Sequence, residues 1–429
     1  MRRYSWETGP FQSQYLAAFK HRNFRLFFVG QLLSISGTWM QKVAEGWLAY
    51  RITGSALMLG LVAFAWGAPA VFLSPIAGLI ADRMDRRRML MFGQAAAMVQ
   101  AFTLALLTLK GWITPTRLAL LALVMGVVNS FENPARHSFF AQLVSREDLI
   151  NAIGLNATLV YTARVVGPAA AGLIIAAYSE GVCFFINGLS YMAVLLCVQV
   201  MQFEKRGRER RSLSTVELLR EGSGYVKKNH LVRSLLMLFG VMNFAGVPYL
   251  TLMPMMAGVV LGMGATGLGC LFAASASGSL ICGIFMAGRP EPLGLLKAVL
   301  VASLLFGTAL FGLSLSREFF LALAVLPFIG GGYLVTLAGT QTLLQSLVPD
   351  EMRGRVMSFY SLAFFGFAPF GNLIEGWIAE RIGVALTLRM GGLVCFGAGL
   401  LFARSFTQIQ ASALQMGLVY AKKQSELSL

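Results

Sequence analysis

Charged residues are scarce in this sequence. Asp, Glu, Lys and Arg make up 13% of the 429 residues, while hydrophobic residues make up 57%. An ordinary soluble domain carries about 25% charged residues. The longest polar stretches are residues 1–23, 203–230 and 404–429, and no soluble catalytic domain fits in any of them. The composition therefore argues against a soluble enzyme.

Motifs for metal, nucleotide and hydrolase chemistry are also missing. The sequence contains no HExxH, GxxxxGK or GxSxG, and its three histidines are far apart in the chain. A GxGxxG at 262–267 follows no strand and precedes no phosphate-binding lysine, so it predicts only a loop. The five cysteines lie in apolar stretches without CxxC spacing, which favours small apolar fillers. We predict no enzyme activity, no metal and no cofactor.

What the sequence has in abundance is apolar stretches of about 20 residues, each long enough to cross a hydrocarbon core. Because a backbone in lipid must satisfy its own hydrogen bonds, each stretch should be a helix. The sequence predicts an all-α integral membrane fold with twelve spans, at 24–50, 56–80, 88–109, 116–135, 151–177, 182–202, 231–254, 266–287, 295–314, 319–343, 354–379 and 384–403. No cleavable signal peptide precedes the first span, so it is expected to remain as an anchor.

The spans fall into two halves of six. The expected division is an N-terminal half, a connector, a C-terminal half and a tail, at 1–202, 203–230, 231–404 and 405–429. A weak internal repeat supports it, because a shift of 204 residues places Gly167 on Gly371 and Gly172 on Gly376. Parallel halves with a substrate site between them are a transporter architecture. The connector predicts either an amphipathic helix on the membrane surface or a solvated linker.

The net charge of +16 is concentrated on one side of the predicted membrane. If both termini face the cytoplasm, most of the 35 Lys and Arg lie in cytoplasmic loops and ends. This is the positive-inside pattern, so the charge indicates topology rather than a nucleic-acid surface. We expect a multi-pass protein of a bacterial inner membrane with both termini cytoplasmic and no nucleic-acid partner.

The loop between the second and third spans reads GLIADRMDRRRML at 78–90. A positive-inside loop explains its arginines but not an aspartate four residues after a glycine. The segment resembles the signature loop of the major facilitator superfamily, with Asp85 in place of the second glycine. The resemblance implies a conformational latch between the halves. Its expected residues are Gly78, Asp82, Arg83, Arg86 and Arg87, with Glu132, Arg136, Arg353 and Arg355 either as partners or as ordinary helix-end charges.

The fifth span is similar to the antiporter motif of the same superfamily, G-x8-G-x3-G-P-x2-G-G. The matching residues are Gly154, Gly167, Pro168 and Gly172, and alanines replace two glycines. The resemblance implies export, since the motif marks antiporters that extrude; the alternative is generic small-residue packing. Strings at 37–60 and 347–360 resemble the subgroup with the enterobactin exporter and macrolide efflux proteins. The chain departs from the antiporter pattern in the fourth span, which lacks the usual proton-relay arginine.

Polar residues inside the spans predict a cavity. A charge at mid-bilayer costs roughly 2.5–3.5 kcal/mol on insertion scales, so the polar stripe of the first span should face protein or water. Lys42 and Glu45 are either a neutralising pair or linked to substrate or protons. Arg164 is expected either to form an ion pair with Glu45 or Glu375 or to contact the substrate. The cavity and coupling candidates are Gln31, Thr38, Gln41, Lys42, Glu45, Arg164, Asn243, Gln341, Asn372 and Glu375.

Together these features predict a secondary active transporter that exports an amphipathic small molecule, drug or siderophore-like, by alternating access. We expect protons as the coupling ion, contact with membrane lipids and a monomeric protein. The absence of a nucleotide-binding motif leaves no direct ATP drive. Two alternatives remain: an importer or lipid flippase on the same fold, and a non-transporting membrane receptor or assembly factor.

Overall fold

The computed structural model describes residues 17–83, 85–140, 143–145, 147–201, 215–286 and 292–414, except for some side chains within helices. This part of the chain is helical and contains no strand. Its elements are η1 (Ala17–Lys20), α2 (Arg22–Thr53), α3 (Ala56–Arg83), α4 (Arg86–Leu109), α5 (Pro115–Phe140), α6 (Leu149–Ala177), α7 (Glu180–Val200), α8 (Thr215–Lys228), α9 (His230–Ala245), α10 (Tyr249–Met255), η2 (Met256–Val260), α11 (Ala265–Met286), α12 (Pro292–Leu315), α13 (Phe319–Leu347), α14 (Asp350–Ile382) and α15 (Val384–Arg404).

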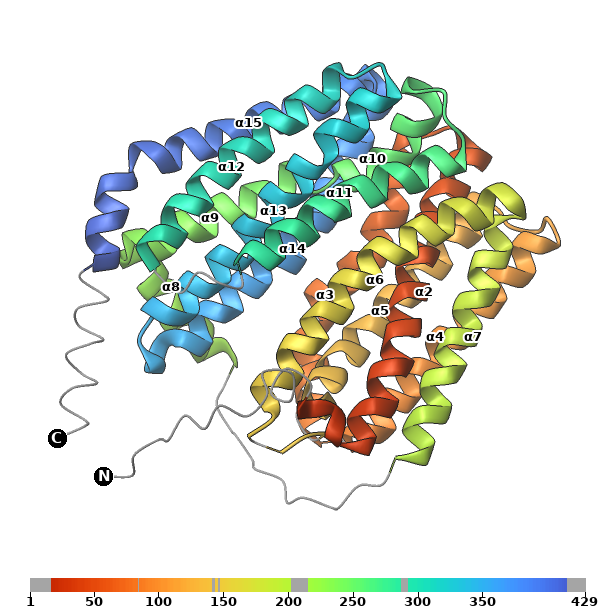
Figure 1. Ribbon diagram of the computed structural model, residues 1–429, viewed down its shortest axis with the longest axis horizontal. Coiled ribbons are helices and arrows are strands. Elements are labelled where there is room, and N and C mark those ends of the chain that lie inside the picture. The colour runs from red at the N-terminus through yellow and green to blue at the C-terminus, as the bar shows by residue number, and fades with distance from the viewer. Residues whose placement is uncertain are drawn as a thin grey trace.

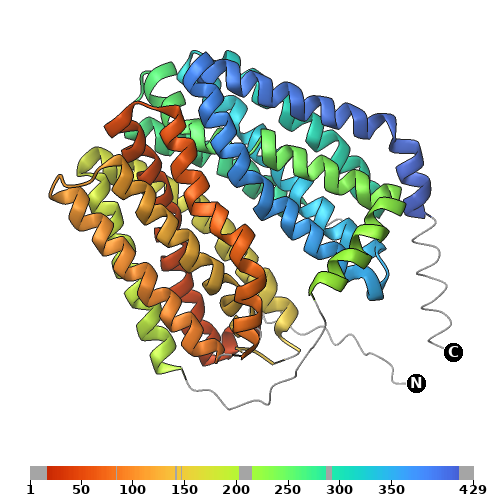
Figure 2. The same ribbon diagram turned by 180° about the vertical axis from the view of Figure 1, so that it is seen from behind.

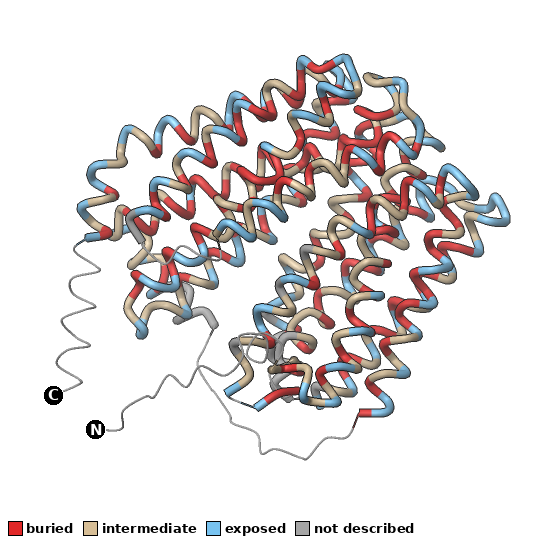
Figure 3. Tube along the Cα trace, in the orientation of Figure 1, coloured by how far each residue is buried: buried red, intermediate tan, exposed pale blue. Residues whose placement is uncertain are grey.

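The predicted all-α membrane fold is confirmed. Within the described residues, eleven helical segments are long and apolar enough to cross a membrane, with α9, α10 and η2 counted as one. The twelfth is α2, which has 32 residues but carries Gln31, Gln41, Lys42 and Glu45. These polar residues lower its mean hydropathy without shortening it. Apolar side chains lie along the outside of both groups of helices, where exposed positions are pale blue in Figure 3.

Helices α2–α7 form one half of the molecule and α9–α15 form the other (Figure 1). The halves lie close together at the end where α2 passes into α3. They diverge toward the end that holds α8, in the view of Figure 1 and from behind in Figure 2. We call these the closed end and the open end. The chain runs from the open end along α2, so its later residues lie progressively nearer the closed end.

Small residues bring the halves together at the closed end. Gly172 on α6 faces Gly269 on α11 so closely that a Cβ on Gly172 would lie 2.7 Å from the Gly269 Cα. Gly60 on α3 packs in the same way against the backbone of α14 at Gly376. Side chains larger than glycine would hold the two backbones apart at these points. The closed end is therefore sealed by close backbone packing.

A carboxylate from one half also caps a helix of the other. Glu380 on α14 accepts hydrogen bonds from the Ser55 Oγ at 2.9 Å and from the Leu57 backbone N–H at 3.1 Å. Ser55 immediately precedes α3, and Leu57 lies in its first turn, where backbone N–H groups lack partners within the helix. The cap joins the halves only while the closed end stays shut.

The described part of the connector is a helix docked on the C-terminal half. Glu221 on α8 pairs with Arg355 on α14 at 2.5 Å, and Gly222 packs beside the ring of Phe359. The linker alternative therefore does not apply to Thr215–Lys228, whereas residues 203–214 lie outside the described part. Past α15, residues 406–414 are helical too, and Ile409 is fully buried. The first residues of the expected tail thus pack on the bundle.

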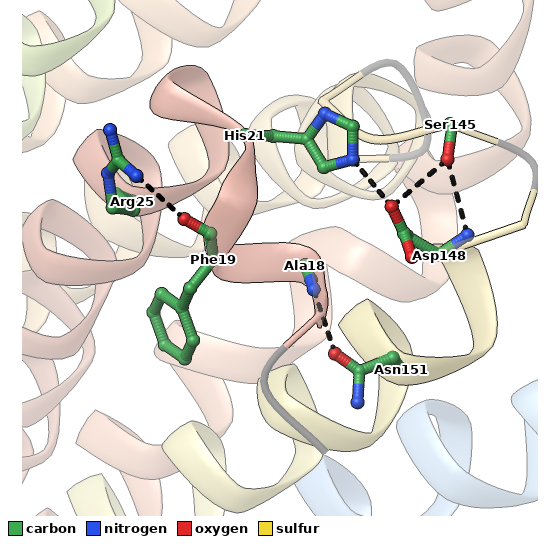
Figure 4. A network of polar contacts seen from close by, with 7 residues as sticks. All are labelled: Ala18, Phe19, His21, Arg25, Ser145, Asp148 and Asn151. Carbon is green, nitrogen blue, oxygen red and sulfur yellow. Dashed lines mark hydrogen bonds and ion pairs between the residues drawn. The ribbon is translucent and has the colours of Figure 1, made fainter. Parts of the chain in front are cut away.

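The start of the described chain is tied to α6 by a small polar network, drawn in Figure 4. His21 Nε2 donates to the Asp148 Oδ2 at 2.7 Å, and the Ala18 backbone N–H donates to the Asn151 Oδ1 at 3.0 Å. Ser145 Oγ lies 3.2 Å from the same Asp148 oxygen. The hydrogen bond from His21 holds the pKa of Asp148 below its ordinary value.

This pair predicts a loss of stability in acid. A carboxyl with a depressed pKa stabilises the fold fully above its unfolded value, about 3.9, and the contribution disappears as the pH falls through the lower folded value. Asp148→Asn removes that dependence. We expect the melting temperature of wild type to fall more than that of Asp148→Asn between about pH 5 and pH 3. Identical pH profiles would contradict the prediction.

Candidate functional site

A cavity of about 140 Å³ lies between the two halves. Its wall is mostly apolar and comes from α2 and α3 on one side and from α10, α11 and α14 on the other. The polar or aromatic residues of the wall are Trp39, Lys42, Glu45, Trp66, Thr251, Phe272 and Asn372. Thr251 Oγ1 donates to the Asn372 Oδ1 at 3.0 Å, which joins α10 to α14. An apolar cavity with a few convergent polar groups is the usual form of a small-molecule site.

The polar stripe of α2 does not face the cavity as a whole. Thr38 bonds to the hydroxyl of Tyr191 on α7 at 2.9 Å, and Gln31 is buried with neither amide atom bonded in the described structure. Lys42, on the opposite edge of the stripe from Gln41, is exposed in the cavity wall. Gln31 and Thr38, which were named as cavity candidates, therefore do not line this cavity. Both face the interior of the N-terminal half, which agrees with the expectation that the stripe faces protein or water.

Gln41 is the centre of a buried amide network within the N-terminal half. Its Nε2 donates to the Glu45 Oε1 at 2.8 Å and to the Gln100 Oε1 at 3.0 Å. Its own Oε1 accepts from Asn187 Nδ2 at 2.7 Å. Three helices besides α2 thus help to orient Glu45, since Gln100 is anchored in turn to the Leu121 carbonyl of α5. Glu45 is only 2% exposed, yet it still borders the cavity.

Neither intramembrane cation has the carboxylate partner that the sequence suggested. Among the described residues, no acid lies within 4 Å of Arg164 or Lys42, so the expected pairing of Arg164 with Glu45 or Glu375 is absent. Instead both cations lie over the ring of Trp39, Arg164 at 5.0 Å and Lys42 at 5.3 Å from its centroid. Lys42 also lies 4.7 Å from the ring centroid of Trp66. Trp39 belongs to α2, Trp66 to α3 and Arg164 to α6, so sequence spacing could not reveal that they meet.

The other candidates of the C-terminal half are dispersed. Asn372 is in the cavity wall, but Glu375, one turn further on, is buried beside Gly391 of α15 and away from the cavity. Asn243 accepts a hydrogen bond from the Tyr333 hydroxyl at 2.9 Å, which links α9 to α13. Gln341 is exposed and is not part of the cavity wall. Of these four residues, only Asn372 borders the cavity.

The seventh span contains a break that was not predicted from the sequence. Helix α9 ends at Ala245, and α10 begins at Tyr249 after a turn at 246–248 that contains a glycine and a proline. Val247 in this turn and Thr251 in α10 both line the cavity. Irregular backbone at membrane depth is tolerated where it borders a cavity, and transporters use such breaks at their binding sites. The Gly-Val-Pro triplet was the signal for this break.

The expected latch partners are engaged locally at the open end. Glu132 accepts from Gln94 Nε2 at 2.7 Å and lies 3.9 Å from Arg136. Arg353 pairs with Asp350 at 2.6 Å, and Arg355 pairs with α8 as above. Arg87 donates to backbone carbonyls of α7. The side chains of Gly78, Asp82, Arg83 and Arg86 lie outside the described part of the structure, so the latch stays a prediction.

The antiporter-like motif divides between two interfaces. Gly167 packs against Ser36, Trp39 and Met40 of α2, within its own half, whereas Gly172 contacts α11 across the halves. The Pro168 carbonyl oxygen would lie 3.3 Å from a Cβ on Gly269, so it borders the same crossing. Gly154, nearer the open end, is exposed with nothing within 4 Å of its Cβ position. Gly167 thus lets α6 pack closely against α2 beside Trp39, and Gly172 lets α6 contact α11 at the closed end.

Comparison with known proteins gives one family. A family model described as transmembrane secretion effector matches residues 13–423. The chain is 24% identical to the staphyloferrin A transporter of Staphylococcus aureus over 372 residues, 86% of this chain and 92% of that one. It is 23% identical to macrolide efflux protein A of Streptococcus pyogenes over 377 residues, 85% and 92% of the two chains.

Solved structures share the fold. The nucleoside transporter NupG superposes with a TM-score of 0.68 at 13% identity, covering 90% of this chain and 98% of that one. A bacterial homologue of the lysosomal transporter Spinster, in an inward-facing and unoccupied conformation, gives a TM-score of 0.63 at 15% identity, covering 96% and 98%.

Proposed function

The chain belongs to the transmembrane secretion effector family of the major facilitator superfamily, and from this premise we propose that it exports an amphipathic small molecule by proton antiport. It is a multi-pass membrane transporter and not an enzyme, which removes the receptor or assembly-factor alternative. In the proposal the membrane is the bacterial inner membrane, the protein acts as a monomer, and both termini are cytoplasmic. The open end is then the cytoplasmic end.

The observation that carries the proposal is the cavity between halves that are sealed at one end and diverge at the other. A carrier of this kind must exchange this state for one in which the seal opens, and substrate and protons act by stabilising one state more than the other. The similarity to macrolide efflux protein A favours export of an amphipathic compound. The mostly apolar cavity wall is compatible with such a substrate.

Transport in inverted membrane vesicles tests the proposal. We expect vesicles that contain the protein to accumulate an amphipathic compound when energised, and to lose it when an uncoupler is added. Export without sensitivity to the uncoupler would reject proton coupling. Energy-dependent depletion from the vesicle interior would instead support the importer or flippase alternative, which the missing fourth-span arginine leaves open.

Asp82→Asn tests the proposed latch. Asp82 lies at the open end of α3, where the latch would hold the halves together in the state that is closed to the cytoplasm. Loss of the carboxylate should destabilise that state by about 1–3 kcal/mol and slow transport about 5- to 150-fold, with expression and melting temperature unchanged. Asp85→Asn is the matched control, because Asp85 lies in the same loop and, among the described contacts, caps α4 through the Arg88 N–H. Wild-type rates in a well-expressed Asp82→Asn protein would rule the latch out.

A further inference from the structure

Two cations lie over the ring of Trp39, which lines the cavity, and no acid among the described residues lies within 4 Å of either of them. Lys42 is exposed in the cavity wall, whereas Arg164 is not part of the wall itself but lies over the ring of Trp39, which is part of it. The Arg164 Nε is buried and has no hydrogen-bond partner among the described residues. A charge within a membrane normally has a partner or marks a substrate path, because its burial is costly. The unused donors of this pair therefore require an explanation.

The aromatic rings hold the cations but do not neutralise them. Trp39 and Trp66 place the Lys42 ammonium by cation–π contacts, which stabilise a cation over a ring face and leave its N–H donors available. Glu45 is the carboxylate of the described cavity wall, but it is beyond 4 Å from either cation and accepts its hydrogen bond from Gln41. The donors of Lys42 and Arg164 are thus available for a group that the described residues do not supply.

Arg164 and Lys42 lie one after the other between the open end and the closed end. Arg164 precedes Gly167 by almost one turn of α6, and Gly167 packs at the level of residues 36–40 of α2. Lys42 comes after that level on α2, so it lies deeper, toward the closed end. A ligand that enters from the open end therefore passes Arg164 before it reaches Lys42. Beyond Lys42 the wall contains the apolar side chains of Leu59 and Val62, together with Glu45 and Asn372.

We propose that this cavity binds an organic anion: a carboxylate-type group held by Lys42 and Arg164, attached to an aromatic or apolar body that packs on Trp39 and Trp66. This names the substrate class of the transporter and rests on the proposed function. The cations supply charge-assisted hydrogen bonds to the anion, and the rings supply flat surfaces for the body. The same chemistry describes a small soluble organic anion and the anionic headgroup of a lipid.

Binding of three matched probes to the purified protein tests the proposal by equilibrium dialysis. 2-Naphthylacetate is an anion, 2-naphthylethanol is neutral and 2-naphthylethylamine is a cation, and all carry the same ring system. We expect naphthylacetate to bind at least about 10-fold more tightly than the amine, since each hydrogen bond to a charged group is worth about 1.5–3 kcal/mol. Equal affinity, tighter binding of the amine, or no binding of any probe would overturn the proposal.

Substitutions assign the selectivity to the two cations. Lys42→Met with Arg164→Met should weaken naphthylacetate binding about 10- to 100-fold and leave naphthylethanol unchanged. The charge-preserving pair Lys42→Arg with Arg164→Lys should retain most of the affinity, which separates loss of charge from misfolding. Arg117→Gln is the matched control, because Arg117 is exposed at the start of α5, and its described bonds go to Thr114 and to the Trp112 carbonyl just before that helix. Unchanged naphthylacetate binding by the double Met variant would contradict the assignment.

Competition distinguishes the source of the anion, and vesicles separate this inference from the proposed function. Displacement of naphthylacetate by lysophosphatidylglycerol but not by lysophosphatidylcholine would place a lipid headgroup in the anion site, whereas displacement by neither favours a soluble anion.

Selective anion binding without uncoupler-sensitive transport of any probe would reject proton antiport but support the anion site. Transport of naphthylethylamine in preference to naphthylacetate would contradict the anion site but support the proposed export function.

Discussion

Gly172→Leu is expected to abolish transport by forcing the closed end apart. The Cβ of the new side chain would lie 2.7 Å from the Gly269 Cα and 2.9 Å from the Ala265 carbonyl oxygen, both backbone atoms of the other half. Overpacking of this kind costs about 1–3 kcal/mol, and only the sealed state bears the cost. The equilibrium between the two states should shift about 5- to 150-fold toward the state that is open at the closed end.

The sidedness of thiol labelling measures this shift. In a cysteine-free background, a single cysteine in place of Ala63, in the cavity wall, should react with an impermeant maleimide only from the open-end side. In Gly172→Leu it should react from the opposite side as well. Gly154→Leu is the control on the same helix, because its side chain meets open space. Wild-type labelling and transport in Gly172→Leu would show that the glycine contact does not seal the protein.

Glu45→Gln is expected to uncouple transport from the proton gradient. Glu45 is buried in the amide network of Gln41 and borders the cavity, so one carboxylate is within reach of both the substrate and a network that spans four helices. One charge crossing 100 mV yields about 2.3 kcal/mol, enough for an approximately 50-fold concentration ratio. Without a proton site the variant should equilibrate substrate across the membrane but not accumulate it.

Glu375→Gln is the comparison for this experiment. Glu375 is also a buried intramembrane acid, but it lies against α15 outside the cavity wall, so its loss should reduce coupling less than the loss of Glu45. Substrate-driven proton movement in proteoliposomes with a pH-sensitive dye measures both variants. Full proton movement in Glu45→Gln would exclude Glu45 as the coupling site, and loss only in Glu375→Gln would transfer that role to the C-terminal half.

Several residues of the site could be recognised from the sequence, but the residues that surround them could not. Lys42, Glu45 and Asn372 were recognised as unusual in apolar spans, and all three border the cavity. Trp39 and Trp66 were not singled out, because an aromatic residue in a membrane span is ordinary. Only the placement of two cations over one indole gives Trp39 a role. The sequence offered no sign of that arrangement, since Arg164 and Trp39 are on different helices.

The sequence by itself determined the number of spans, their helical state and the presence of a polar stripe on α2. These follow from length, hydropathy and the 100° repeat, which act within one helix. Tertiary structure decided which edge of the stripe meets the cavity, that Arg164 has a ring rather than a carboxylate beside it, and that Gly172 but not Gly167 contacts the other half. The physical reason is that a helix repeat fixes which residues share a face, whereas close packing between helices distant in the chain fixes what that face touches.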